Sequence, residues 1–371
     1  MRNRKINKRL TAILQCTTIF NLPASTGYLK LVIFLVTLFL YPLISHAQDL
    51  HFSQWFNSPL TTNPANTGFI PDADYRIGGN YRSQYVNVLS VPYKTFSVFG
   101  DAQLFRNKLD NAWMGVGGVI LRDAAGSGNL TSTKVYGSLA YHQELGSASL
   151  LTAGFNLGWA NKSINPSQLK FPDQFNKATG FFDAGIPTSV VFNSTNTNYL
   201  DVQVGMNYAY FPTDNLYLNG GFSIQHVNRP RETFFTNSTG FDDRLAARYI
   251  GFFNASIKVS DDVILNPMGY YSNQARASEF VAGGNLNYNL SGEGDYQLLG
   301  GIYYRSSDAV IPMLGFQVSN FRMTFTYDVT TSSLSTYNNG HGAVEFSLIK
   351  NGFFTQLNGS RRQSLCPTFA N

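Results

Sequence analysis

Between residues 75 and 348 the chain repeats one pattern, in which about ten residues alternate between apolar and polar before a turn follows. In residues 321–329, Phe, Met, Tyr and Val side chains fall on one face and Arg, Thr and Asp side chains on the other. Successive side chains of a strand point to opposite faces, so this segment has one apolar and one polar surface. Soluble sandwiches also alternate, but their strands are usually about five or six residues long. The pattern therefore predicts a β-barrel that spans a bilayer.

Counting these segments gives about fourteen strands, which predicts an all-β, antiparallel transmembrane barrel. The expected strands are residues 75–84, 93–104, 113–122, 133–144, 150–160, 201–210, 216–227, 248–259, 263–272, 279–289, 296–305, 309–318, 321–327 and 341–348. Their connections mostly alternate between short ones, such as 260–262, and longer ones, such as 161–200 and 228–247. Outer-membrane barrels have short periplasmic turns and longer outside loops, so an even strand number places both mature termini in the periplasm.

The first 47 residues have the composition of an export signal. A basic stretch precedes an apolar run from Leu31 to Ile44, and Ser45, His46 and Ala47 provide a plausible cleavage site. The run is too short for a spanning helix, which needs about 20 apolar residues. Without this leader, 21 basic residues face 22 acidic ones, because six of the 27 basic residues precede Gln48. The net charge of +5 therefore gives no support for nucleic-acid binding.

The chain outside the strands divides into two ends. Residues 48–74 are rich in Pro and Asn and too irregular for a spanning strand, so we expect a plug in the lumen or a periplasmic contact segment. Residues 75–349 form the expected barrel, and residues 350–371 form a periplasmic tail. That tail carries Cys366, the single cysteine after the leader, so an intrachain disulfide is excluded.

The sequence gives no support for catalysis, a cofactor or a metal. The histidines after the leader are widely scattered, and no group of His, Cys and Asp has the spacing of metal ligands. His142 shares the expected lumen face with Lys134 and Ser138, which we interpret as ordinary polar lining rather than a catalytic pair. We therefore expect a protein that is not an enzyme.

Several stretches resemble the PorP/SprF family. They are DLHFSQ (49–54), SPL (58–60), NPANTG (63–68), NYRSQY (80–85), GIYYRSSDA (301–309) and FTYDVTTSSL (325–334). The resemblance extends over residues 49–369 at consistent spacing. Ser307 departs from the family's "YRSGDA", and no Arg stands between Pro367 and Phe369.

The resemblance implies an outer-membrane component of the type IX secretion system of Bacteroidetes-like bacteria. Members of this family act with cell-surface cargo, including gliding adhesins, or with periplasmic components of the system. For this chain the resemblance implies outer-membrane lipid as a partner, together with a secreted surface protein or other components of the system. It implies no nucleic-acid partner.

Two functions remain open at this point. The first is a barrel that supports secretion or surface attachment of partner proteins, with its loops or its N-terminal segment as contact surfaces. The second is a passive channel or solute transporter, for which we would expect dense opposed charges in the lumen. We favour the first. Phe52, Gln54, Asn63, Pro64 and Arg82 are the candidate positions for partner contact or plug anchoring, and they could equally close the periplasmic mouth.

Overall fold

The computed structural model describes residues 52–106, 108–109, 111–126, 128–183, 185–235, 243–354 and 367–369. The expected leader and Cys366 lie outside the described residues, as does most of the expected tail. All described residues belong to one compact unit, residues 45–371.

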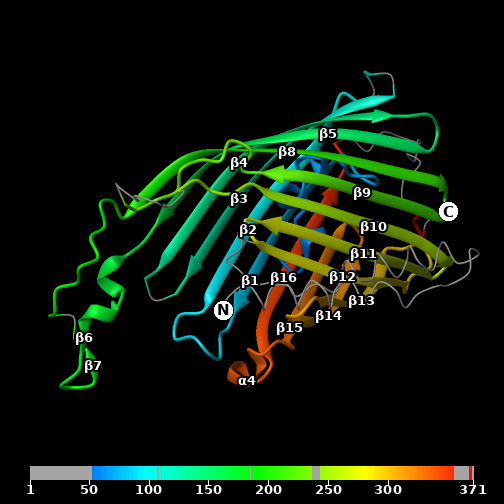
Figure 1. The fold of residues 1–371 in the computed structure, drawn as a ribbon. Helices are drawn as coiled ribbons and strands as arrows, with labels where there is room; N and C mark the ends of the chain where they lie inside the picture. The colour runs from blue at the N-terminus through cyan, green and yellow to red at the C-terminus, as the bar shows by residue number, and fades with distance from the viewer. Residues whose placement is uncertain are drawn as a thin grey trace, which may run out of the picture. The chain divides into compact units, whose positions relative to one another are not determined.

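Fourteen antiparallel strands form one closed barrel (Figure 1). They are β1 (Tyr75–Gln84), β2 (Tyr93–Leu104), β3 (Ala112–Ala125), β4 (Leu130–Glu144), β5 (Ser149–Ser163), β8 (Asn196–Thr213), β9 (Leu216–Gln225), β10 (Arg248–Ser260), β11 (Val263–Gln274), β12 (Ala277–Asn289), β13 (Tyr296–Arg305), β14 (Ala309–Val318), β15 (Phe321–Thr330) and β16 (His341–Gly352). The predicted number, order and antiparallel arrangement of the strands are confirmed.

The first and last strands close the barrel. Tyr75 of β1 is paired with Gly352 of β16 on one side and with Ala102 of β2 on the other, and both ladders continue to Gln84. A closed sheet leaves no row of unpaired backbone groups, which the interior of a bilayer would penalise by several kcal/mol for each group.

The two faces of the wall differ as the alternation predicts. Along β8, Val204, Met206 and Tyr208 point outward and are exposed, whereas Gln203 and Asn207 point inward and are buried. The outward side chains form an apolar surface that suits lipid, and the inward polar groups are available to line the lumen.

The barrel has two different ends. At the turn end, where β1 begins and β16 ends, the connections are short, as between β8 and β9 or between β10 and β11. At the loop end the chain makes the long connections 164–195 and 226–247 and the connection 331–340, which contains α4 (Ser335–Asn338). Pro367 to Phe369 return to the turn end, where Phe369 packs against Gly294.

The connection 164–195 extends far from the barrel (Figure 1). It contains η5 (Pro166–Gln168), η6 (Pro172–Gln174) and the small hairpin of β6 (Phe175–Asn176) and β7 (Phe181–Phe182). The carboxylate of Asp173 fixes part of this loop, because it accepts hydrogen bonds from the Ser189 backbone N–H at 2.6 Å and from Thr188 Oγ1 at 3.0 Å. These donors, first of all the Ser189 N–H, hold the pKa of the exposed Asp173 carboxyl below its usual range.

Several strands are longer than predicted. β8 begins at Asn196 rather than residue 201, and β16 continues to Gly352 rather than 348, because these ends pair with β5 and β1 although their sequences no longer alternate cleanly. β9 ends at Gln225 rather than residue 227, since His226 adopts a positive φ of 57°.

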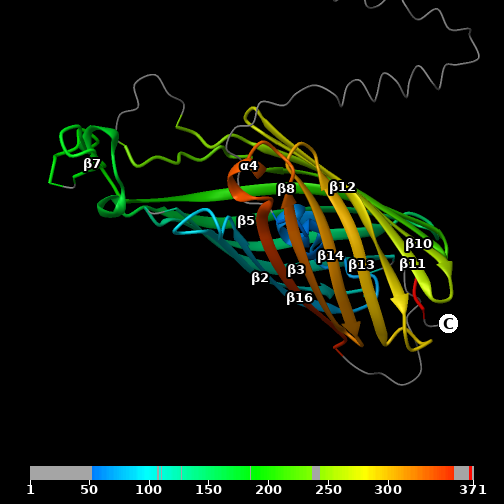
Figure 2. The same ribbon diagram turned by 90° about the horizontal axis from the view of Figure 1, so that it is seen from below.

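Three short helices precede β1 and lie inside the barrel, where Figure 2 shows them in blue between the strands. They are η3 (Trp55–Asn57), α3 (Pro59–Thr62) and η4 (Pro64–Asn66). None of the helices in the described part of the chain is long and apolar enough to cross a membrane.

Candidate functional site

Residues 52–74 form a plug, a compact segment seated in the lumen. Its fold follows from local sequence: Pro59 and Pro64 occupy the first position of their helices, where proline loses no hydrogen bond. Asn63 caps η4 by accepting a hydrogen bond from the Ala65 N–H at 2.9 Å. These prolines and caps make the segment a series of tight turns that cannot join the sheet.

The beginning of the plug is bound by one carboxylate. The backbone N–H groups of Ser53 and Gln54 donate to Oε2 and Oε1 of Glu345 at 2.8 and 2.9 Å. Gln54 is fully buried, and its side chain also donates to Thr326 Oγ1 at 3.2 Å. Hydrogen bonds to a charged acceptor are about twice as strong as neutral ones, so Glu345 of β16 fixes this end of the plug firmly.

Two arginines complete a buried ion cluster around Ser53. Arg82 of β1 donates to Glu345 at 3.1 Å, to Asp328 of β15 at 2.9 Å and to Ser53 Oγ at 2.5 Å. Arg305 of β13 donates to Asp328 at 2.9 Å and to Ser53 Oγ at 2.6 Å. Taking such charges out of water is repaid only by full pairing, so loss of one partner from a buried pair costs about 3–5 kcal/mol.

The middle of the plug is bound to the backbone of the opposite wall. Asn63 Nδ2 donates to the carbonyl oxygens of Met206 in β8 and Phe222 in β9 at 2.9 and 3.3 Å. Asn156 Nδ2 of β5 donates to the Leu60 carbonyl at 3.2 Å, and Ser223 Oγ of β9 donates to the Thr62 carbonyl at 2.8 Å. The plug therefore joins walls on both sides of the lumen.

At several glycines of the wall, the absence of a side chain lets the plug lie directly against the strand backbone. A Cβ added at Gly115 of β3 would lie 1.9 Å from the Thr67 carbonyl oxygen, and one at Gly205 of β8 would lie 1.9 Å from Asn63 Oδ1. Real Cβ atoms essentially never approach another heavy atom within 3.0 Å. These two positions are glycine because the plug occupies the space of a side chain.

The end of the plug is held near the turn end. His142 of β4 makes a 2.8 Å hydrogen bond through Nε2 to the Thr67 carbonyl oxygen, and its ring stacks on Trp113 at 4.8 Å. Trp113 Nε1 donates to the Gly68 carbonyl at 3.1 Å, and the Gly68 N–H donates to Asp101 at 2.8 Å.

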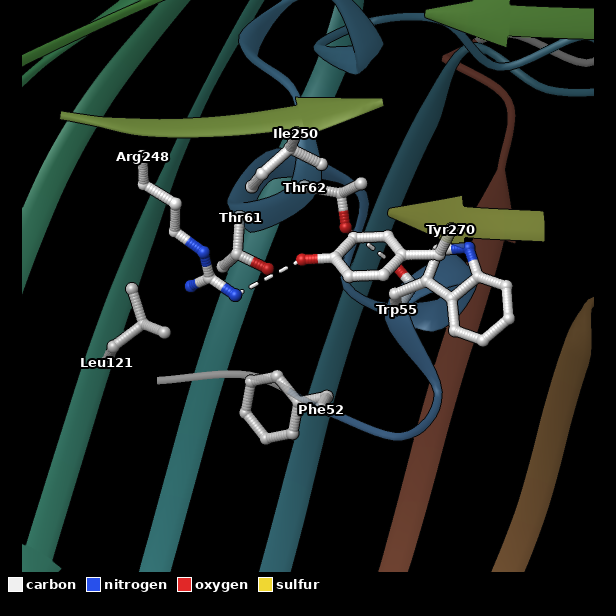
Figure 3. Close-up of a pocket in the computed structure, with 8 residues that line it drawn as sticks. All are labelled: Phe52, Trp55, Thr61, Thr62, Leu121, Arg248, Ile250 and Tyr270. Carbon is white, nitrogen blue, oxygen red and sulfur yellow. Dashed lines mark hydrogen bonds between the residues drawn. The ribbon is translucent and has the colours of Figure 1, made fainter. Parts of the chain in front are cut away.

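Small cavities lie between the plug and the wall, and two of them are described by their lining. The first has a volume of about 20 Å³ and the second about 30 Å³. Figure 3 shows the residues that line the first: Phe52, Trp55, Thr61, Thr62, Leu121, Arg248, Ile250 and Tyr270. A water molecule needs at least about 10–15 Å³, so each cavity has room for about one or two waters and not for a solute.

The structure brings the five candidate residues of the sequence into the plug and its anchor. Phe52 is buried in an apolar cluster with Leu60 and Phe99, and Pro64 lies against Gly154 of β5. Gln54, Asn63 and Arg82 make the contacts described above, and all five are buried. Their role in partner contact stays a prediction.

The sequence analysis did not identify most of the side chains that bind the plug. Glu345, Asp328 and Arg305 are anchoring residues. Their inward positions on predicted strands were one available signal, and the family-like stretches 301–309 and 325–334, which contain Arg305 and Asp328, were another. His142 was interpreted as ordinary lumen lining but binds the plug. In the described residues no group of three His, Cys, Asp or Glu side chains could hold a metal ion.

The sequence pattern of one family covers most of this chain. The model of the family described as "Type IX secretion system membrane protein PorP/SprF" matches residues 44–349. The chain belongs to the PorP/SprF family. The resemblance drawn from the short motifs is thereby confirmed, and the PorP/SprF chain described here is a non-enzymatic β-barrel of the outer membrane in the type IX secretion system.

Solved barrels with low sequence identity resemble this PorP/SprF chain. The toluene transporter TodX of P. putida is 14% identical, with a TM-score of 0.48, over 81% of this chain and 95% of its own. The toluene transporter TbuX of Ralstonia pickettii is 12% identical, with a TM-score of 0.47, over 80% and 94%. A Pseudomonas aeruginosa FadL homologue is 9% identical, with the same TM-score and coverage as TbuX. No curated protein matches the chain.

Proposed function

We propose that this barrel is a closed platform that supports secretion or cell-surface attachment of partner proteins, such as gliding adhesins, without conducting solutes. The observation that carries this proposal is the plug. It contacts opposite walls of the lumen through charged groups at Ser53 and backbone groups at Asn63. Two cavities between the plug and the wall have volumes of only about 20 and 30 Å³, which supports a filled lumen.

The partner surface in this proposal is the loop end, which faces the outside of the cell, while the turn end faces the periplasm. Long outside loops and short periplasmic turns support this orientation, in which the C-terminal tail is periplasmic and residues 1–47 are removed on export. The loops expose apolar side chains: Phe181 is 75% exposed, Val191 71% and Tyr337 78%. In this proposal, these exposed apolar side chains of the long loops contribute to the partner surface.

The alternative, a passive channel or solute transporter, is tested by conductance in planar bilayers. We expect no steady ion current from the whole barrel, and a steady current from a variant that lacks residues 53–67. The channel hypothesis requires a steady current from the unmodified barrel with the plug in place.

Site-specific photo-crosslinking in cells tests the partner surface. A crosslinker at Phe181 should capture a secreted surface protein, while one at Asp261 in the β10–β11 turn should capture a periplasmic component or nothing. Capture of the same secreted protein from Asp261 alone would contradict the proposed orientation.

A further inference from the structure

Successive residues of the plug contact the wall at successive levels of the barrel, from the loop end toward the turn end. Ser53 is bonded to Asp328, which lies two residues before β15 ends at the loop end. Asn63 is bonded to Met206, in the middle of β8. Gly68 is bonded to Asp101, which lies three residues before β2 ends at the turn end. The plug therefore runs through the lumen from the loop end to the turn end.

The chain reverses direction after the plug. The Ile70 carbonyl accepts a hydrogen bond from Gln103 Nε2 at 2.6 Å, and the Asp74 N–H donates to the Gly352 carbonyl at 2.8 Å. β1 then runs back from the turn end to the loop end, antiparallel to β16 and β2. Phe52, the first described residue, and Tyr75, the first residue of the barrel wall, consequently lie toward opposite ends.

We infer that the chain enters the lumen from the loop end, so the N-terminus left by leader removal is presented on the same side as the long loops. We expected both mature termini in the periplasm because the number of strands is even. That expectation considered only the ends of the first and last strands and not the path of the segment before them. Those two ends do meet at the turn end, through Tyr75 and Gly352, but the plug carries the preceding chain to the other side.

The length of chain before the plug is sufficient for this placement. Cleavage after Ala47 leaves residues 48–51 before Phe52, which span up to about 13–14 Å when extended. Glu345, which binds Ser53, lies four residues from the loop end of β16 at His341, a rise of about 13 Å along a tilted strand. Four residues are therefore long enough to span the distance to the mouth, as the inference requires.

Cysteine labelling in whole cells tests this inference. In a Cys366→Ser background, single cysteines replace Asp49 near the N-terminus, Thr179 in the exposed loop 164–195, or Asp261 in the β10–β11 turn, where the side chain is 95% exposed. A membrane-impermeant maleimide should label Asp49→Cys and Thr179→Cys in intact cells, and Asp261→Cys after permeabilisation alone.

The outcomes distinguish a failure of this inference from a failure of the proposed function. The inference rests on the proposed function only for the assignment of the loop end to the outside of the cell. Labelling of Asp49→Cys together with Asp261→Cys, or after denaturation alone, would overturn the inference. If Thr179→Cys and Asp261→Cys exchange their behaviour, the proposed orientation fails. The inference stands in that case if Asp49→Cys still follows Thr179→Cys.

Discussion

Substitution of Gly115 by alanine tests whether the plug is a fixed part of the barrel. The new Cβ would lie 1.9 Å from the Thr67 carbonyl oxygen, whereas an ordinary contact needs at least 3.4 Å. The plug backbone must move by the difference, about 1.5 Å, which breaks the 2.8 Å bond between Thr67 and His142. Overpacking costs about 1–3 kcal/mol and a lost hydrogen bond about 1 kcal/mol, so we expect local opening to become easier by about 2–4 kcal/mol.

Hydrogen exchange followed by mass spectrometry measures this effect on the backbone amides of residues 58–69. Each 1.4 kcal/mol is a factor of ten, so exchange should be faster by a factor of about 30 to 700. Gly300→Ala in β13 is the matched control, because a Cβ there meets nothing within 4 Å. Unchanged exchange in Gly115→Ala, or equal acceleration in the control, would refute the argument that the wall glycines are shaped to the plug.

Three further changes test the anchor and the loop. Arg82→Met leaves Asp328 and Glu345 buried without this partner and should lower the free energy of unfolding by about 3–5 kcal/mol in urea titrations. The exposed Arg231→Met should cost less than about 1 kcal/mol, and a similar cost for both would contradict a buried anchor. Asn63→Ala removes both bonds to β8 and β9 and should cost about 1–3 kcal/mol, seen as a lower urea midpoint. The low pKa of Asp173 implies that its carboxylate stabilises the loop above about pH 4 and that this effect is lost as the pH falls through the depressed pKa. Amides of residues 185–193 should therefore exchange more slowly than in Asp173→Asn at pH 6, and this difference should shrink as the pH falls below about 4. A difference that does not change with pH would contradict this origin.

The barrel could be predicted from the sequence because its determinants are local. Apolar and polar residues alternate with a period of two in segments such as β13 and β14, whose predicted and observed bounds agree. The alternation fails at the loop end of β8, where the strand is extended by pairing with β5 rather than by its own pattern.

The plug anchor could not be predicted, because its residues are brought together by barrel closure. Arg82 and Glu345 are far apart in the sequence, yet they face each other once β1 pairs with β16. Neither strand carries a signal of this neighbour. The need for glycine at position 115 could not be predicted either, because it arises from the close approach of the Thr67 carbonyl oxygen in the plug.

The bond between Ser53 and Glu345 also constrains the order of assembly. It joins residues separated by 292 positions. The backbone N–H of Ser53 can therefore bind Glu345 only after the final strand, β16, has been made. Contacts between distant residues form late and slowly, because the intervening chain must first be ordered. A chain that stops before β16 lacks Glu345, the acceptor of the backbone N–H groups of Ser53 and Gln54, although Asp328 of β15 can still bind the Ser53 hydroxyl. The complete set of bonds at the start of the plug therefore requires that β16 has been made and has closed the barrel.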